Sequence, residues 1–253
     1  MIEQTSVGGP ETVPHVSVVI PARNEELCLA ATIESVQAAV AATGLTGEII
    51  VVDDASDDRT ADIARGLGCS VVPVELHNIG AVRNAGAKQA RGQWIVFLDA
   101  DTLLPAGTLK AALRAMDDGA VGGGAWVTFD KRLGWFQRGL AWLFCLLWQR
   151  VRGWAAGCFI YCRRVDFEAV GGFDEQYFAA EERFLSEALM TRGKFVILKE
   201  SVITSARKLR LFSTGKLLWI AVRTLCTGRH RIQQREGLEI LYDAPREKSM
   251  SGQ

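Results

Sequence analysis

The amino-acid sequence predicts an α/β protein with a mostly parallel β-sheet flanked by helices. Three observations lead to this prediction. Short runs of apolar, β-branched residues alternate with stretches in which apolar residues recur at helical spacing. The β-like runs are almost wholly apolar, as strands covered on both faces should be. Several of them end directly at polar or acidic residues, and in parallel sheets ligands bind beyond the carboxyl ends of the strands.

The first half of the chain predicts four strands that alternate with helices. The predicted strands span residues 16–20, 48–52, 70–74 and 94–98. The predicted helices span residues 25–42, 60–67, 79–90 and 105–117. We expect the first strand to stop at Pro21, and we place Pro105 in the first turn of its helix, where proline is favoured. Repetition of this kind indicates a parallel sheet with helices on both faces.

The second half of the chain is less regular. It predicts strands over residues 121–129, 159–162 and 195–198. It also predicts helices over residues 135–154, 178–192 and 209–227, the first rich in tryptophan and the last basic and amphipathic. We therefore expect a helical region towards the C-terminal end, and disordered tails over residues 1–14 and 241–253.

Composition and charge narrow the class of protein. The 253 residues are 49% apolar and 23% charged, which is ordinary for a globular domain and excludes a disordered chain. No apolar run reaches the ~18 residues expected of a membrane span. The net charge is zero, but residues 1–130 hold 17 acidic and 8 basic side chains, whereas residues 131–253 hold 12 acidic and 21 basic ones. The second half is therefore the better candidate to contact an anionic ligand or surface.

Asp99 and Asp101 follow the apolar run WIVFL directly. Two carboxylates two residues apart can face one ligand where a strand ends in a turn. Hard oxygen ligands of this kind suit Mg²⁺ or Mn²⁺ holding a diphosphate. For an isolated pair, a turn with a helix cap is the alternative. The polar ends of the other core strands favour the metal site here.

A second acidic cluster ends the strand over residues 48–52. Asp53 and Asp54 come too early to cap the next helix, and a base or ribose contact is a reasonable use for one of them. The alternative is a plain loop in which Ser56 or Asp57 caps that helix.

The segment around Gly80 and Arg83 has the pattern of a phosphate site. A glycine lies near the start of a predicted helix, and an arginine follows one turn later. A helix N-terminus attracts phosphate, and the guanidinium group adds two parallel donors. The alternative is an arginine exposed on a solvated helix face.

Glu181 and Glu182 lie in the first part of the predicted helix over residues 178–192. Carboxylates near a helix N-terminus are favourable in themselves. They are also candidates for a general base in an acceptor cleft. The pair alone leaves both interpretations open.

Taken together, these segments resemble the family 2 glycosyltransferases of the GT-A fold. The matching segments, in the family's order, are VSVVIPARNEE (16–26), EIIVVDDASDDRTADIA (48–64), NIGAVRNAGAKQARGQWIVFLDADTLLP (78–105) and AVGGFDEQYFAAEERFLSEAL (169–189). The resemblance implies that a nucleotide-diphospho-sugar binds at the strand ends with Mg²⁺ or Mn²⁺. It further implies that the sugar passes to an acceptor hydroxyl with inversion, as in the synthesis of cell-envelope polysaccharide.

The resemblance also assigns roles to individual residues. Those matching the donor pocket are Pro21, Ala22, Asn24, Glu25, Asp53, Asp54, Gly80, Arg83 and Asp99. Among them, Asp54 matches the acid that reads the base, with Asp53 as its less certain partner. Asp101 matches the direct metal ligand, and Asp99, the other member of the metal pair, is expected nearer the ribose. The family usually has Glu-Asp at the acceptor site, so Glu182 takes the place of the base, with Glu181 beside it.

The resemblance divides the chain into a nucleotide-sugar-binding half, residues 15–130, and an acceptor-side half of the same catalytic domain, residues 131–240. Two other functions stay open. One is a non-catalytic module that binds a nucleotide-sugar or a membrane surface. The other, less favoured because the loop PARNEE lacks glycine, is a sugar nucleotidyltransferase.

The expected partners are a nucleotide-sugar donor and a carbohydrate or lipid-linked acceptor, with no nucleic acid. We expect a cytoplasmic protein. The basic helices over residues 135–154 and 209–227 either place it peripherally on the anionic inner face of a membrane or cover the sheet as ordinary core.

Overall fold

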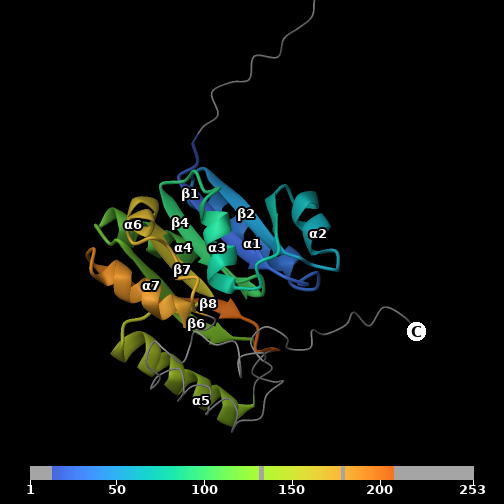
Figure 1. Ribbon diagram of the computed structural model, residues 1–253. Helices are drawn as coiled ribbons and strands as arrows, with labels where there is room; N and C mark the ends of the chain where they lie inside the picture. Colours follow the sequence, from blue (N-terminus) through green and yellow to red (C-terminus); the bar gives the residue numbers. More distant parts are fainter. Residues whose placement is uncertain (1–12, 131–133, 178–179, 208–253) are drawn as a thin grey trace, which may run out of the picture.

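The structure, a computed structural model, describes residues 13–130, 134–177 and 180–207. The predicted helix over residues 209–227, the tail over residues 241–253 and most of the N-terminal tail lie outside these residues. The described part of the chain forms one curled sheet with helices against it (Figure 1).

Eight strands make up the sheet, in the order β3-β2-β1-β4-β7-β6-β8-β5. Their bounds are β1 (Val16–Ala22), β2 (Gly47–Asp54), β3 (Ser70–Val74), β4 (Trp94–Leu98), β5 (Thr102–Leu103), β6 (Gly122–Phe129), β7 (Phe159–Arg163) and β8 (Phe195–Thr204). The pairs β1–β2, β1–β4, β2–β3 and β6–β8 are parallel. β7 runs antiparallel between β4 and β6, and β5 runs antiparallel to β8. The prediction of an α/β fold with a mostly parallel sheet is confirmed.

Helices cover both faces of this sheet. Their bounds are α1 (Leu29–Ala41), α2 (Thr60–Gly66), α3 (Ile79–Ala87), α4 (Ala106–Asp117), α5 (Trp135–Cys145), the π-helix η1 (Leu146–Val151), α6 (Arg164–Ala169) and α7 (Glu181–Met190). One buried cluster joins α1 and α4 to the sheet, and a second joins α3, α6 and α7 to the opposite face. Along β1 the side chains alternate between them, since Val18 and Ile20 enter the first cluster and Val19 the second.

Several predicted boundaries differ from the structure. β1 continues past Pro21 to Ala22, because its pairing with β2 extends to Ala22↔Asp53. Its pairing with β4 covers only Val16–Val19. Beyond that point proline's missing N–H breaks no pairing on the β4 side. β8 is longer than predicted and ends at Thr204, and the predicted helix over residues 135–154 ends as the π-helix at Val151. β5 and α6 were not predicted.

α1 begins at Leu29, later than the predicted residue 25. The backbone of Asn24 has a φ of 52°, in the left-handed region, and this reverses the chain after β1. The intervening turn brings Glu25 to the carboxyl edge of the sheet instead of into the helix. None of the helices in the described ranges combines the length and apolar character needed to cross a bilayer.

Candidate active site

The predicted site residues gather where β1, β2 and β4 end. Pro21 and Ala22 are the buried last residues of β1, and Asp53 and Asp54 close β2. The remaining predicted groups come from the loops and helices that follow: Asn24, Glu25, Gly80, Arg83, Asp99, Asp101, Glu181 and Glu182. Because the strands are parallel, their carboxyl ends share one edge, as the sequence predicted.

Arg83 forms the centre of a buried ion cluster. Its side chain is 3% exposed, so the alternative of a solvated arginine is wrong. Nη1 donates to Oε1 of Glu181 at 2.7 Å, and Nη2 donates to Oδ1 of Asp99 at 2.9 Å. Nη2 also donates to the carbonyl of Gly157 at 2.8 Å. Burial alone would lower the pKa of Arg83, but these two carboxylates and Glu182 raise it, so the guanidinium stays charged.

Glu182 lies beside this cluster. A methyl group on Gly157 would lie 3.5 Å from Nη2 of Arg83 and 3.6 Å from Cδ of Glu182, so both groups border one small space. Burial raises the pKa of Glu182 to about 8, the charge of Glu181 adds to the shift, and Arg83 opposes it. Glu181 is thus tied by the arginine, whereas Glu182 is a half-buried carboxyl group that takes up a proton readily.

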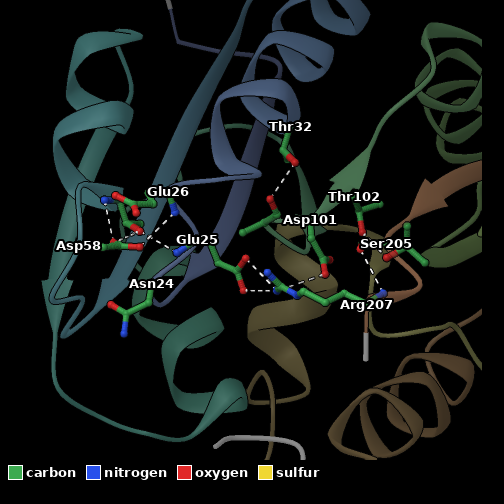
Figure 2. A network of polar contacts seen from close by, with 12 residues as sticks. Asn24, Glu25, Glu26, Thr32, Asp58, Asp101, Thr102, Ser205 and Arg207 are labelled. Carbon is green, nitrogen blue, oxygen red and sulfur yellow. Dashed lines mark hydrogen bonds and ion pairs between the residues drawn. The ribbon is translucent and has the colours of Figure 1, made fainter. Parts of the chain in front are cut away.

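A second arginine, Arg207, lies beyond the end of β8 and reaches across to the ends of β1 and β4 (Figure 2). Nη2 donates to Oε1 of Glu25 at 2.8 Å and to Oε2 at 2.9 Å. The same atom is 3.7 Å from Oδ2 of Asp101. The backbone supports this approach, because the N–H of Ser205 donates to the carbonyl of Asp101 at 3.1 Å.

The acids at the end of β2 differ in their partners. Asp54 accepts from the backbone N–H of Leu76 at 2.7 Å and of His77 at 3.1–3.2 Å, so it fixes the loop before α3. In the described part of the chain, Oδ1 of Asp53 is buried and has no hydrogen-bond partner. The role of Asp54 in reading a base stays a prediction, and Asp53 is the acid with unused acceptor capacity.

The loops that follow β1 and β2 hold each other in place. The N–H of Asn24 donates to Oγ of Ser56 at 2.9 Å, and its Oδ1 accepts from the N–H of Asp57 at 2.7 Å. Neither Ser56 nor Asp57 caps α2: its N-cap is Arg59, without a side-chain cap, and Oδ1 of Asp58 accepts from the N–H of Thr60, the first residue of the helix, at 2.9 Å. The prediction of that cap was wrong because Ser56 is used between the loops.

Gly80 is placed by packing at the start of α3. A Cβ there would lie 3.3 Å from Oδ1 of Asn78 and 3.3 Å from Cβ of Phe173. Asn78 caps the helix by accepting from the N–H of Ala81 at 3.0 Å. The absence of a side chain therefore lets the segment around Phe173 close over the helix start.

Backbone strain concentrates around these residues. In the described ranges, the non-glycine residues with positive φ are Asn24, Ala55, His77 and Ala180. Each is a predicted site residue, lies next to one or bonds to one, and Ala180 directly precedes Glu181. Conformations of this kind are retained where the surrounding structure demands them, and they cluster at functional sites.

Most of this arrangement falls within one known family of sequences. The family model described as glycosyl transferase family 2 matches residues 17–177. The chain belongs to this family. The family 2 domain thus covers the strand ends, the Arg83 cluster except Glu181, and β7, and the predicted resemblance is confirmed.

Curated relatives of the family 2 domain include two undecaprenyl-phosphate 4-deoxy-4-formamido-L-arabinose transferases. The protein from Edwardsiella ictaluri is 35% identical over 150 residues, which are 56% of this chain and 46% of the relative. The protein from Pseudomonas paraeruginosa is 41% identical over 103 residues, 38% of this chain and 30% of the relative. The chain therefore matches less than half the length of these relatives.

Solved structures share the fold at low sequence identity. A mannosyltransferase from Pyrobaculum calidifontis, in complex with GDP-Man and Mn²⁺, has a TM-score of 0.63 at 20% identity, covering 83% of this chain and 61% of its own. Glucosyl-3-phosphoglycerate synthase from Mycobacterium tuberculosis, in complex with Mn²⁺ and UDP, has a TM-score of 0.58 at 18% identity, covering 84% and 77%. The predicted GT-A fold is confirmed.

The carboxylates of the family 2 domain fit a cation shared with a substrate. Within the described ranges, no three His, Cys, Asp or Glu side chains are grouped as a metal cage. Asp99 and Asp101 supply only hard oxygen donors, which suit Mg²⁺ or Mn²⁺. Mg²⁺ is typically held by one or two carboxylates together with substrate phosphates, so this sparse donor set fits such a cation.

Sequence reasoning missed Arg207 and the carbonyl of Gly157. No spacing rule points to either, because their partners lie far away in the chain. One signal was available for Arg207: the run SVIT (201–204) is β-like and extends β8 to the edge where the predicted acids gather.

Proposed function

We propose that this chain is an inverting glycosyltransferase that moves a sugar from a nucleotide-diphospho-sugar to an acceptor hydroxyl in a metal-dependent reaction. The main observation behind the proposal is that the carboxylates around Arg83 differ in how they are bound. The arginine binds Asp99 on the donor side and Glu181 on the acceptor side, and leaves Glu182 available. Arg83 thereby holds a carboxylate of the proposed donor side next to one of the proposed acceptor side.

Glu182 is the proposed general base. A base must be deprotonated to act but must also hold a proton well, and its raised pKa of about 8 meets both needs near neutral pH. Glu181 is a weaker candidate, since its carboxylate is neutralised by Arg83 at 2.7 Å. Glu182 accepts the proton of the acceptor hydroxyl as that oxygen attacks the anomeric carbon, on the face opposite the leaving diphosphate. One displacement gives inversion.

The donor is proposed to bind across the ends of β1 and β2. Asp53 offers a buried acceptor atom to a ribose hydroxyl or base N–H, and unpaired buried acceptors are costly unless a ligand satisfies them. Pro21, Ala22 and Asn24 form the adjoining wall, with Gly80 on the side of α3. We retain Asp54 as a second donor contact.

Asp101, with Asp99, would hold the divalent cation together with the donor's diphosphate. A bound cation supplies charge neutralisation for the nucleoside diphosphate that leaves. Arg83 is a second positive charge on the same side, fixed by its contact to Asp99, and it is preorganised to stabilise charge that develops nearby.

A lipid-linked acceptor at an anionic membrane surface is the proposed acceptor class. Apolar side chains of α5 and η1 are exposed, namely Trp142, Leu143, Leu147 and Val151, with Arg138, Arg150 and Arg152 exposed around them. An apolar face with a basic border suits the headgroup region, where each Lys or Arg adds about 1 kcal/mol. The names of the curated relatives give undecaprenyl-phosphate as their substrate. Liposome flotation at low salt tests this; protein that stays at the bottom contradicts it.

The same proposal divides the domain by task. Residues 15–130 carry the proposed donor contacts, and residues 131–240 carry the proposed base and the exposed apolar face. Strands from the described residues of both parts belong to one sheet, which supports treating the two parts as halves of one domain. A cytoplasmic location at the inner face of a membrane, and a role in cell-envelope polysaccharide, belong to this proposal.

A thermal-shift screen with UDP, GDP and dTDP sugars and Mn²⁺ tests the function. A ligand that binds the native state raises the melting temperature by mass action. We expect one nucleotide class to raise it and EDTA to cancel the rise. A donor-hydrolysis assay then separates an enzyme from a binding module. Binding without turnover, with water or any lipid or sugar acceptor, would favour the module, and no stabilisation by any nucleotide-sugar would contradict the proposal.

A further inference from the structure

Arg207 places a positive charge at the centre of the proposed donor site. Figure 2 shows its guanidinium between the carboxylates of Glu25 and Asp101, which come from the ends of different strands. All three side chains are nearly buried, with Arg207 9% exposed and each carboxylate 12% exposed. Burial alone would lower the pKa of Arg207, and its bonds to Glu25 raise it, so the arginine remains charged.

This position conflicts with a divalent cation on Asp101. Mg²⁺ bound to that carboxylate would be about 2.0–2.1 Å from its oxygen, whereas Nη2 of Arg207 is already 3.7 Å from Oδ2 of the same group. Two positive charges this close repel each other strongly in a site shielded from water. With only the two carboxylates present, the arginine and the cation compete for the same negative charge.

A diphosphate changes that balance. It brings negative charge that the arginine and the cation can share, and arginine binds phosphate through two parallel N–H donors. The arginine and the cation then both bind the diphosphate instead of competing for Asp101. Glu25 can keep the guanidinium in place throughout, because it accepts through both oxygens while the contact to Asp101 is longer.

We propose that Arg207 couples cation binding to donor binding: it holds Asp101 while the donor is absent, and turns to the donor's diphosphate when donor and cation bind together. The inference rests on the proposed function and deepens it by naming a positioning residue. Its consequence is that the cation binds weakly until a nucleotide diphosphate is present. A merely structural tie between β8 and β1 would stabilise the fold without affecting cation affinity.

Mn²⁺ titrations followed by the EPR signal of the free ion test this role. Wild type, Arg207→Gln and the charge-retaining Arg207→Lys are titrated alone, with UDP and with GDP, and each nucleotide is titrated without protein to subtract its own Mn²⁺ binding. In wild type we expect the nucleotide to tighten Mn²⁺ binding at least about tenfold, within the usual range of coupling between sites. In Arg207→Gln we expect Mn²⁺ alone to bind several-fold tighter and the nucleotide effect to shrink by a similar factor. Arg207→Lys should stay close to wild type.

The outcomes separate the two proposals. If neither UDP nor GDP binds wild type, dTDP is titrated in the same way, and failure of all three contradicts the proposed function. If a nucleotide binds with Mn²⁺ but Arg207→Gln leaves Mn²⁺ affinity unchanged or weaker, the role of Arg207 is wrong and the proposed function stands. Should Arg207→Gln not fold, wild type alone still decides against the idea if Mn²⁺ binds equally well with and without nucleotide.

Discussion

Arg83 and Arg207 each join carboxylates from different elements, but they are held in different ways. Arg83 is 3% exposed and has three acceptors within 2.9 Å: Glu181, Asp99 and the carbonyl of Gly157. Arg207 is 9% exposed, is bonded closely to Glu25, and lies 3.7 Å from Asp101. Within the described residues, both Nη atoms of Arg83 have close acceptors while its Nε has none. In the same residues, Arg207 has one close carboxylate, Glu25, and one more distant carboxylate, Asp101.

The difference follows from what each arginine faces. Arg83 fixes the carboxylate next to the proposed base, and displacement by about 1 Å at such a place can cost about 10²-fold in rate. Arg207 faces the place where a cation and a diphosphate are proposed to enter, so its contacts must exchange. We therefore expect substitutions around Arg83 to affect turnover and stability, and substitutions around Arg207 to affect ligand binding.

The largest expected effect is that of Asp101→Ala. Transfer should fall below detection and donor affinity should drop, because the diphosphate loses the cation that joins it to the protein. EDTA should reproduce both losses in wild type. Activity is measured as release of nucleoside diphosphate, and affinity by calorimetry. Full turnover of wild type in EDTA would refute the metal site.

Unlike Asp101→Ala, Glu182→Gln should reduce turnover but not donor affinity. The amide keeps the size and hydrogen bonding but cannot accept a proton, so turnover should fall at least about 10²-fold while donor affinity barely changes. Glu181→Gln is the matched control and should reduce turnover less. A large loss in Glu181→Gln with little in Glu182→Gln would exchange the two roles.

The two arginines should also differ in what they contribute to stability. Arg83→Gln leaves the buried Glu181 and the partly exposed Asp99 without their cation. Loss of one partner of a buried ion pair costs roughly 3–5 kcal/mol. Arg207→Gln should cost about 1–2 kcal/mol, since it removes hydrogen bonds to one close carboxylate. Urea unfolding of both variants measures the difference, and equal losses would show that the two clusters are equally fixed.

The donor side of the site was the part most open to prediction from sequence. Asp53, Asp99 and Asp101 were found because each follows an apolar strand, and parallel strands bring their carboxyl ends to one edge. The partners of Arg83 were not predictable from spacing. Glu181 is 98 positions away, and only the fold brings α7 against α3.

Arg207 shows where such reasoning stops. Its partner Glu25 is 182 positions away, and β8 was predicted to end at residue 198, so the arginine fell in the approach to a helix. The strand ended too early in the prediction because Lys199 and Glu200 interrupt the apolar run. Neighbouring strands decide such a strand's length, since β8 pairs with β6 up to Phe129↔Thr204.

The pH dependence of turnover is a smaller test of the Arg83 side. The pKa of Glu182 is raised to about 8, and only the deprotonated form accepts a proton. The rate should therefore rise about tenfold per pH unit below pH 8 and level off above it. Glu182→Gln should lose this dependence in its residual activity. A profile with its inflection near the ordinary value of a glutamate would contradict the assignment.

The smallest expected effect is on how stability changes with pH. It tests the Arg83 side of the site, through Glu182, without any ligand. The pKa of Glu182 is about 8 in the folded protein, against an ordinary value of 4.5, so between these values the native state holds a proton that the unfolded chain has lost. Stability that this carboxyl group confers is complete below pH 4.5 and is lost as the pH rises towards 8.

Glutamine at this position cannot lose a proton. The melting temperature of Glu182→Gln should therefore exceed that of wild type by an amount that grows from about pH 5 to pH 8 and is constant above, at about 2–4 °C per kcal/mol. Glu168→Gln, which removes an exposed carboxylate from α6, is the control and should show no such growth. If the two variants follow wild type in parallel across this range, Glu182 ionises as an ordinary surface glutamate and the case for it as the base loses its electrostatic support.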